Sequence, residues 1–153
     1  MNFSAPFIAK DFTKELQEIL PYTDIIIGNE AEAEAWAIAN GLPDSKNISA
    51  IACSIALLPK SNPSRPRNVI FTQGAHQTVR VTSDEPDSPK KYPVNPLADS
   101  QIVDTNGAGD AFAGGFVGAL VSCKNIDDSI VAGHALAHAC VQQVKFWNGF
   151  FFF

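Results

Sequence analysis

The loop from Asp104 to Asp110 has the residue types of a site that handles phosphate. Its sequence is Asp-Thr-Asn-Gly-Ala-Gly-Asp, and a small, apolar run with helical character follows from Ala111 to Leu120. The start of a helix carries unpaired N–H groups and roughly half a positive charge, so the backbone of Gly107, Ala108 and Gly109 would cradle an anion. The sequence therefore predicts an anion-binding loop at a helix N-terminus.

Asp110 stands directly beside this cradle. A carboxylate repels a bound phosphate, but its position is explained if it accepts a proton from an attacking hydroxyl group during phosphoryl transfer. An acid is also favoured in the first turn of any helix, so Asp110 alone leaves both interpretations open. Gly114, Gly115 and Gly118 lie within the helical run at a cost in stability, which predicts that another segment packs closely against it.

The string from Asp104 to Phe116 resembles the C-terminal signature of the ribokinase-like (pfkB) sugar and nucleoside kinases. Asn106 in its third place, and Asn-Phe-Ser-Ala-Pro-Phe-Ile at residues 2–8, are similar to the adenosine kinases of that family. The resemblance implies transfer of the γ-phosphate of ATP to the 5′-hydroxyl of adenosine, giving AMP for purine salvage. It implies that Asp110 is the catalytic base and that residues 107–109 form the anion hole.

A second motif begins at Asn29, where Asn-Glu-Ala-Glu resembles the Asn-x-x-Glu motif of the same family. The resemblance implies that Asn29 and Glu32 organise Mg²⁺ and its waters around the ATP phosphates, since Mg²⁺ takes oxygen ligands and keeps several waters. The same spacing also fits a capping box, in which the N-cap residue and the third helical residue bond to each other. The signature downstream favours the metal interpretation.

Four further residues are assigned to the nucleotide by resemblance. Thr72-Gln73-Gly74 resembles the family's Thr-x-Gly at the end of a strand, which implies that ATP passes close to the backbone there, although a simple turn explains it equally well. Ala132-Gly133-His134 is similar to the adenosine kinases, and His134 is implied to contact the base or ribose. Asn106 is placed at the nucleotide too, and a monovalent cation near Asp104 stays an open possibility.

The hydrophobic pattern predicts an α/β fold in which helices and strands alternate. With the resemblance, it indicates a partial ribokinase-like, Rossmann-like three-layer fold with a mostly parallel sheet and helices on both faces. Helices are predicted over 11–20, 47–58 and 127–144, strands over 24–28, 68–72 and 77–82, a solvent loop over 83–89 and a short edge strand over 92–97.

Composition excludes several classes of function. Lys and Arg number 11 against 16 Asp and Glu, and no basic cluster exceeds Lys90-Lys91, so we expect no binding to nucleic acid. The longest apolar run is shorter than the ~20 residues that span a membrane, so no membrane partner is expected. The three cysteines lack the spacing of a zinc or disulfide site, which predicts buried thiols in a reducing compartment, the cytoplasm or also the nucleus.

The resemblance covers only the C-terminal part of a family member, here residues 1–144. We expect the first strands, the acceptor site and the lid to be missing, and residues 145–153, which are rich in phenylalanine, to be an aberrant extension. The chain would be a monomer when complete and prone to aggregate as a fragment. Two alternatives are an inactive fragment that at most binds nucleotide and a ribokinase-like kinase that acts on a sugar.

Overall fold

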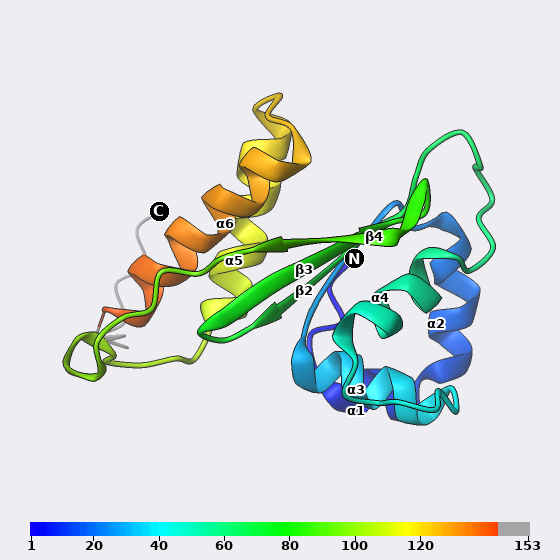
Figure 1. The fold of residues 1–153 in the computed structure, drawn as a ribbon, viewed down its shortest axis with the longest axis horizontal. Helices are drawn as coiled ribbons and strands as arrows, with labels where there is room; N and C mark the ends of the chain where they lie inside the picture. Colours follow the sequence, from blue (N-terminus) through cyan, green and yellow to red (C-terminus); the bar gives the residue numbers. More distant parts are fainter. Residues whose placement is uncertain (144–153) are drawn as a thin grey trace, which may run out of the picture. The chain divides into compact units, whose positions relative to one another are not determined.

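The computed structural model describes residues 1–143 and divides the chain into two compact units, the first from Met1 to Asn95 and the second beginning at Pro96 (Figure 1). The phenylalanine-rich extension predicted at 145–153 lies outside the described residues. Within the described part of the chain, none of the helices combines the length and the apolar character that crossing a membrane requires.

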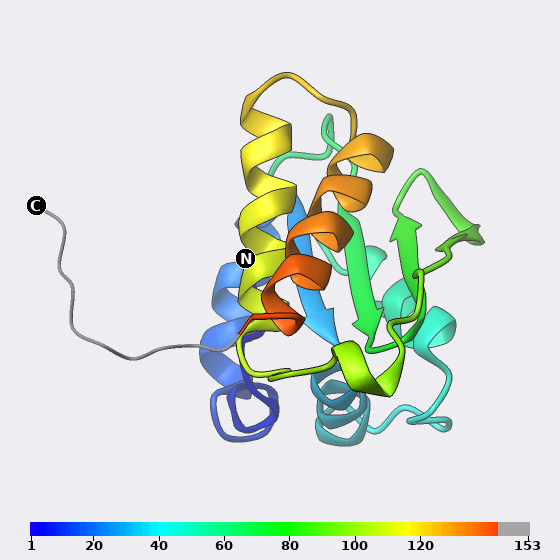
Figure 2. The ribbon, with the colours of Figure 1, turned by 90° about the vertical axis from the view of Figure 1, so that its left-hand side faces the viewer.

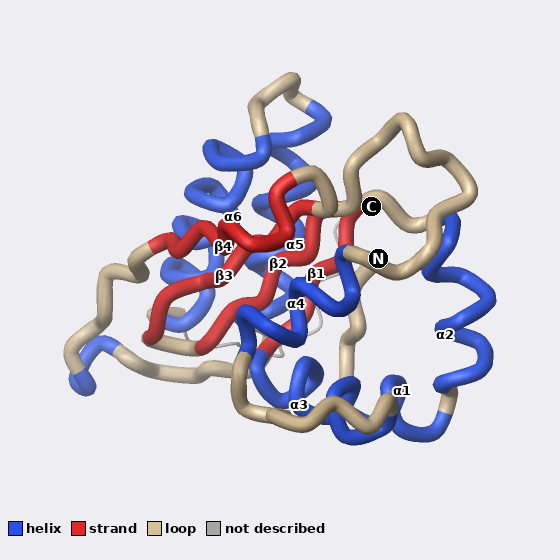
Figure 3. Tube along the Cα trace, turned by 45° about the vertical axis from the view of Figure 1, so that its right-hand side comes forward, coloured by secondary structure: helices blue, strands red, loops and turns tan. Residues whose placement is uncertain are grey.

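The first unit is built on a sheet of four strands in the order β1-β2-β3-β4, shown in red in Figure 3. Strand β1 runs parallel to β2, while β2–β3 and β3–β4 are antiparallel pairs. Two-residue turns at 74–75 and 83–84 join these pairs, and such short connections permit only antiparallel pairing. The α/β prediction is confirmed, but this sheet is mixed rather than mostly parallel. The strands are β1 (Ile25–Asn29), β2 (Asn68–Gln73), β3 (His76–Thr82) and β4 (Glu85–Tyr92).

Strand β4 corrects the predictions for residues 83–97. The segment 83–89 was predicted to be a loop because it is acidic and rich in proline, and an edge strand was predicted over 92–97. The strand instead runs from Glu85 to Tyr92 and contains Pro86 and Pro89. Because β4 is the edge of the sheet, one of its sides needs no ladder partner, and proline is tolerated there.

Five helical segments complete the first unit, and the helix predicted over 11–20 corresponds to α2 (Thr13–Ile19), which follows a separate helix that ends at Asp11. Helix α1 begins with Pro6, which suits the first helical turn because proline lacks an N–H group. At Phe12 the backbone leaves the helical region with φ −119° and ψ 33°, and a new helix begins at Thr13. The segments are α1 (Pro6–Asp11), α2 (Thr13–Ile19), the 3₁₀ turn η1 (Leu20–Tyr22), α3 (Glu30–Ala39) and α4 (Ile48–Ala56).

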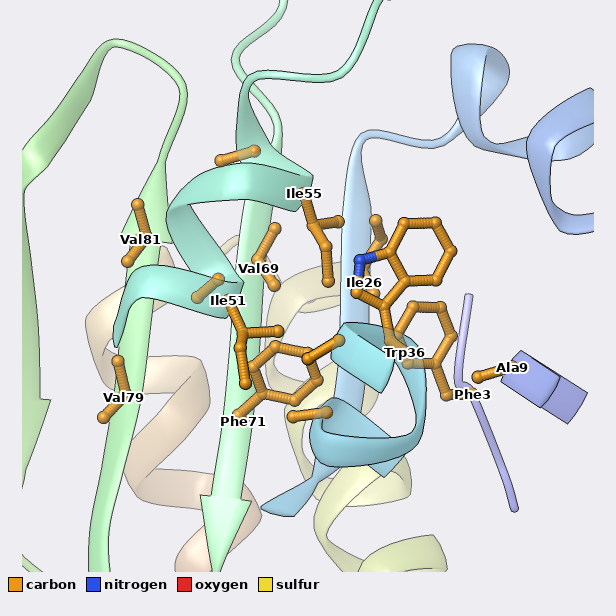
Figure 4. Packing of buried hydrophobic residues seen from close by; sticks show 14 of the residues in the cluster. Phe3, Ala9, Ile26, Trp36, Ile51, Ile55, Val69, Phe71, Val79 and Val81 are labelled. Carbon is orange, nitrogen blue, oxygen red and sulfur yellow. The ribbon is translucent and has the colours of Figure 1, made fainter. Parts of the chain in front are cut away.

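The hydrophobic core of this unit lies between the sheet and helices α3 and α4 (Figure 4). Phe71 of β2 faces Ile51 of α4, and Trp36 of α3 stacks on Phe3 with ring centroids 5.8 Å apart. Phe3 is held beside β1 because its N–H donates to the Ile27 carbonyl at 2.9 Å. The N-terminal residues are therefore part of the core that positions the end of β1.

Arg67 is completely buried at the start of β2. Its guanidinium donates only to backbone carbonyls, at distances from 2.6 to 3.2 Å, and burial lowers its pKa. These carbonyls belong to η1 and the residue that follows it, to the end of α4 and to the loop after α4, so one side chain joins three segments. The acceptors are Leu20, Thr23, Ile55, Leu58 and Pro59.

The second unit contains η2 (Asp99–Gln101) and two long helices, α5 (Ala108–Val121) and α6 (Ile126–Val141), which lie side by side in opposite directions (Figure 2). Gly115 lets them approach, since a Cβ there would lie 2.7 Å from the Ala132 carbonyl oxygen. Gly114 and Gly118 have no described atom within 4 Å of an added Cβ, so the predicted close contact holds only at Gly115.

The cysteines correct one expectation about burial. All three are free thiols, and Cys53 and Cys140 are partly buried. Cys123 is exposed in the turn after α5, so the prediction that it is buried is wrong. The helical pattern ends before this residue, and its left-handed backbone, with φ +62°, belongs to the turn.

Candidate functional site

The first group of predicted site residues meets at the carboxyl ends of β1 and β2. Because these strands are parallel, their carboxyl ends share one edge of the sheet, where ligands bind in α/β proteins. Asn29 and Thr72 lie directly opposite each other in the strand register. The Thr72 hydroxyl donates to the Gly28 carbonyl at 3.3 Å, and Gly74 follows in the turn. The structure thus brings together all four site residues predicted in the first unit.

Asn29 and Glu32 form a complete capping box at the start of α3. The Glu32 N–H donates to Asn29 Oδ1 at 2.9 Å, and Glu32 Oε2 accepts the Asn29 backbone N–H at 3.1 Å. Glu32 Oε1 accepts from the Asn29 side-chain amide at 2.9 Å, and Glu32 is only 4% exposed. The capping interpretation is confirmed, and both carboxylate oxygens of Glu32 are engaged inside the motif.

Gly74 occupies the turn between β2 and β3 with φ +55°, a left-handed conformation that strains any residue with a side chain. The nearest described atom to a Cβ added at this position would be Glu30 Oε1, 4.0 Å away. Conformation, rather than lack of space, therefore requires glycine here, and the surrounding space is open to a ligand.

The second group lies at the start of α5. Gly107 is the N-cap residue with φ +76°, and none of the side chains of residues 1–143 caps this helix. The Ala108 N–H bonds to the Thr105 carbonyl at 3.2 Å. The N–H groups of Gly109 and Asp110 lie in the first helical turn, where no carbonyl of a preceding turn can accept a hydrogen bond from them. The exposed Asp110 thus lies in the first turn of α5 beside the Gly109 N–H, whereas the Ala108 N–H, predicted to face an anion, already has a backbone acceptor.

The loop before α5 is anchored to the end of α6. The backbone N–H groups of Val103 and Asp104 both donate to the Val141 carbonyl, at 3.0 and 3.2 Å. Asp104 Oδ1 accepts the Asn106 N–H at 2.8 Å, which closes a turn just before Gly107. Helix α6 therefore fixes the start of the glycine loop, which is the loop from Asp104 to Asp110.

His134 of α6 packs against Phe112 of α5, with ring centroids 5.4 Å apart. Phe112 lies two residues after Asp110, so this histidine belongs to the same end of the helix pair as the glycine loop. Burial lowers the pKa of His134, so the imidazole is neutral at pH 7 and offers one donor and one acceptor.

The predicted residues thus form two groups, one in each unit: Asn29, Glu32, Thr72 and Gly74 in the first, and Asn106 to Asp110 with His134 in the second. Among residues 1–143, no cluster of three or more His, Cys, Asp or Glu side chains could hold a metal ion by itself.

Two features were missed by the sequence analysis. Gly28, immediately before Asn29, is buried against Glu32, and its only signal is a glycine inside an otherwise apolar strand. A hollow of about 620 Å³ in the first unit, which has no sequence signal, lies beside the start of α4 and is lined in part by Lys46, His76 and Lys91.

Comparison with known proteins agrees with the resemblance found in the sequence. The model of the pfkB family carbohydrate kinases matches residues 1–146. Adenosine kinase from Schizophyllum commune is 56% identical over 144 residues, which cover 94% of this chain and 42% of that protein. The chain therefore spans about two fifths of the length of this relative.

Solved structures show the same relationship in three dimensions. Adenosine kinase from Anopheles gambiae, in complex with P1,P4-di(adenosine-5) tetraphosphate, superposes with a TM-score of 0.91 and 40% identity, covering 95% of this chain and 42% of that chain. Ribokinase from Thermotoga maritima superposes with a TM-score of 0.69 and 27% identity, covering 84% of this chain and 39% of that one. The ribokinase-like fold is thus confirmed.

Proposed function

We infer the function from one premise: the chain belongs to the pfkB family of carbohydrate kinases. We propose that it is part of an adenosine kinase, which transfers the γ-phosphate of ATP to the 5′-hydroxyl of adenosine and yields AMP. Identities of 56% and 40% to adenosine kinases, against 27% to a ribokinase, favour adenosine over a sugar as the acceptor.

The observation that carries this proposal is the start of α5, where Asp110 lies in the first turn of a helix that no side chain caps. Asp110 would orient the attacking hydroxyl group and accept its proton. The N–H groups of Gly109 and Asp110, together with the small residues Gly107 and Ala108, would stabilise the charge on the transferred phosphoryl group. Such preorganised donors act without reorganisation during the reaction.

The residues of the first group fit Mg²⁺ only in part. Glu32 is buried and both of its oxygens accept hydrogen bonds from Asn29, so it does not fit as a direct ligand. Asn29 is only partly buried, and its side-chain oxygen, which accepts the Glu32 N–H, has a second lone pair that fits a site that keeps several waters, as Mg²⁺ sites do. When bound, Mg²⁺ would neutralise charge on the ATP phosphates. Glu32 would hold Asn29 in place.

We assign the remaining predicted residues to ATP. Thr72 and Gly74 border the open turn after β2, and Asn106 lies in the loop from Asp104 to Asp110. His134, neutral at pH 7, suits a contact with the base or ribose. A monovalent cation near Asp104 stays a prediction, and the carboxylate there already accepts one backbone N–H.

A chimera tests this proposal: residues 1–143 replace the matching segment of the Schizophyllum commune enzyme. We expect AMP formation from adenosine and Mg-ATP, and a loss of at least about 100-fold for Asp110→Asn. Asp128→Asn is the matched control, because Asp128 has the same place in the first turn of α6 and is also exposed, and this variant should stay active.

Two outcomes would contradict the proposal. Faster phosphorylation of ribose than of adenosine would support the sugar kinase alternative, and full activity of Asp110→Asn would remove the assigned base. The 153-residue chain by itself forms a further arm of the experiment. ATP binding without AMP formation in that arm would support the alternative of a nucleotide-binding fragment.

We also propose a reducing location for the protein, in the cytoplasm or also in the nucleus. Its support is that the three cysteines are free thiols. We further propose that the complete protein is a monomer. Microscopy of a fluorescent fusion and sedimentation of the chimera test these two points.

A further inference from the structure

We propose that Gly28 is a positioning residue for the Asn29–Glu32 pair, because it leaves the space that the Glu32 carboxylate occupies. Gly28 is buried in β1, and its backbone does not have the left-handed conformation that would itself require glycine. What matters at this position is therefore space. The functional part of the inference rests on the proposed role of Asn29 at the nucleotide.

The geometry around Gly28 leaves no room for a side chain. A Cβ at this position would lie 2.9 Å from Glu32 Oε2 and 2.9 Å from Phe71 Cε1. Contacts this short force at least one neighbour to move. Phe71 is fully buried, and its ring lies 6.2 Å from that of Phe3, so packing holds it on the core side. The Glu32 carboxylate is the group that would be displaced.

Displacing this carboxylate would act directly on Asn29. The oxygen that meets the new Cβ, Oε2, is the one that accepts the Asn29 backbone N–H, and Oε1 accepts from the Asn29 side chain. Asn29 in turn lies opposite Thr72 at the ligand-binding edge of the sheet. Gly28 therefore acts on the site through Glu32, without contacting a ligand itself.

The test begins with Gly28→Ala in the full 153-residue chain. Hydrogen exchange of individual amides, measured by NMR, should become at least about tenfold faster at Asn29, since its N–H loses the Glu32 Oε2 acceptor. Exchange at Glu32 should also become faster, because its acceptor, Asn29 Oδ1, belongs to a side chain that loses its own bond to Glu32 Oε1. Gly118→Ala is the matched control, because nothing lies within 4 Å of a Cβ there. It should leave exchange at both amides unchanged.

A second readout uses the chimera described above. Gly28→Ala should raise the KM for Mg-ATP about tenfold or more and leave the KM for adenosine unchanged, since only the Asn29 side of the site is displaced. If the parent chimera has no kinase activity, the proposed function fails, while the exchange measurement on the chain still decides the role of Gly28.

Phe71→Leu separates this role from simple core packing. It relieves the contact with the ring but not that with the carboxylate, so Gly28→Ala should still accelerate exchange at Asn29 in the Phe71→Leu background. If Gly28→Ala alone does not fold, the Phe71→Leu variant is compared with the double variant that also carries Gly28→Ala. Restoration of slow exchange by Phe71→Leu, or unchanged exchange in Gly28→Ala, would overturn the proposal.

Discussion

A single backbone angle sets the geometry at the start of α5. Gly107 has φ +76°, and this left-handed conformation turns the chain into the helix so that the first N–H groups lie bare. A residue with a Cβ pays roughly 1–2 kcal/mol in that conformation. Glycine is therefore required here by the path of the backbone, whatever the ligand.

Gly107→Ala should consequently lower the free energy of unfolding by about 1 kcal/mol. Gly114→Ala provides the opposite case, because Gly114 lies inside α5 with open space around it, and alanine there should raise the stability by roughly 0.5–1 kcal/mol. Urea unfolding of both variants measures the difference. Equal effects of the two substitutions would refute this account of Gly107.

His134 should make stability depend on pH. Burial lowers its pKa in the folded state, so the unfolded chain binds the proton more tightly. The stabilisation is therefore fully present above the unfolded pKa of about 6.5 and is lost as the pH falls through the lower, folded value. Urea unfolding between pH 7.5 and 5 should show this loss, and His134→Gln should reduce it. An unchanged pH profile in that variant would exclude His134 as the cause.

At the scale of elements, asparagine caps decide where most of the longer helices begin. Asn29, Asn47 and Asn125 each accept a hydrogen bond from the N–H three residues later, at the starts of α3, α4 and α6. Such a cap is worth about 1 kcal/mol. Helix α5 begins without such an asparagine cap, which is what we expect of a helix whose first N–H groups bind an anion.

Two of these caps should differ in function. Asn47→Ala and Asn29→Ala should each lower the stability by about 1 kcal/mol, because each leaves one helical N–H unpaired. Only Asn29→Ala should also raise the KM for Mg-ATP in the chimera, since Asn29 lies at the proposed site. Urea unfolding and steady-state kinetics measure the two effects. A raised KM in both variants would indicate a general loss of order instead.

The elements were predictable where the sequence has one dominant pattern. The apolar run Ile25–Ile27 predicted β1, and Pro21 marked the end of a helical segment. Strand β4 was missed because Pro86 and Pro89 are typical of loops, and only its place at the sheet edge makes them acceptable. The break at Phe12 had no signal at all, because its apolar spacing continues the helical pattern.

The motifs of the candidate site could be predicted from the sequence, but the contacts that position their side chains could not. The glycine loop and the Asn29–Glu32 pair could be identified from spacing and resemblance. The engagement of both Glu32 oxygens within the capping box could not, because one pattern serves capping and metal binding alike. Gly28 was missed because a glycine within an apolar strand does not indicate that the Glu32 carboxylate occupies the space beside it.

At the scale of the whole molecule, several large apolar side chains of the first unit are exposed. Phe7 and Phe12 have exposed fractions of 55% and 46% and contact each other edge to face, and Tyr22 is 77% exposed. Exposed apolar groups of this size promote association. The chain spans about 42% of the length of the Schizophyllum commune relative.

The isolated chain should therefore be only marginally soluble. Replacing Phe7 and Phe12 together by serine should raise its solubility, because both rings face solvent and contribute little to the core. Light scattering of matched concentrations measures the effect, with Gln17→Ser, a substitution of an exposed polar residue on α2, as control. A monodisperse parent chain that melts cooperatively as a monomer would contradict this prediction.

Arg67 should be among the most sensitive positions in the first unit. Arg67→Met leaves buried carbonyls of η1 and α4 without donors, which should cost about 3 kcal/mol or more. Arg67→Lys keeps the charge but offers three donors in place of five, so it should fall between Met and the parent. Urea unfolding measures the series. Equal stability of the Met variant would show that water replaces the guanidinium.

The position of Arg67 has a consequence for the covalent chain. Leu58 and Pro59 precede the exposed, proline-rich loop over 60–66, and Arg67 follows it, so hydrogen bonds within the protein fasten both ends of that loop. A peptide bond cut between Asn62 and Ser64 would break none of these hydrogen bonds. The loop is thus a natural place for new termini in a circular permutant, or for an inserted domain.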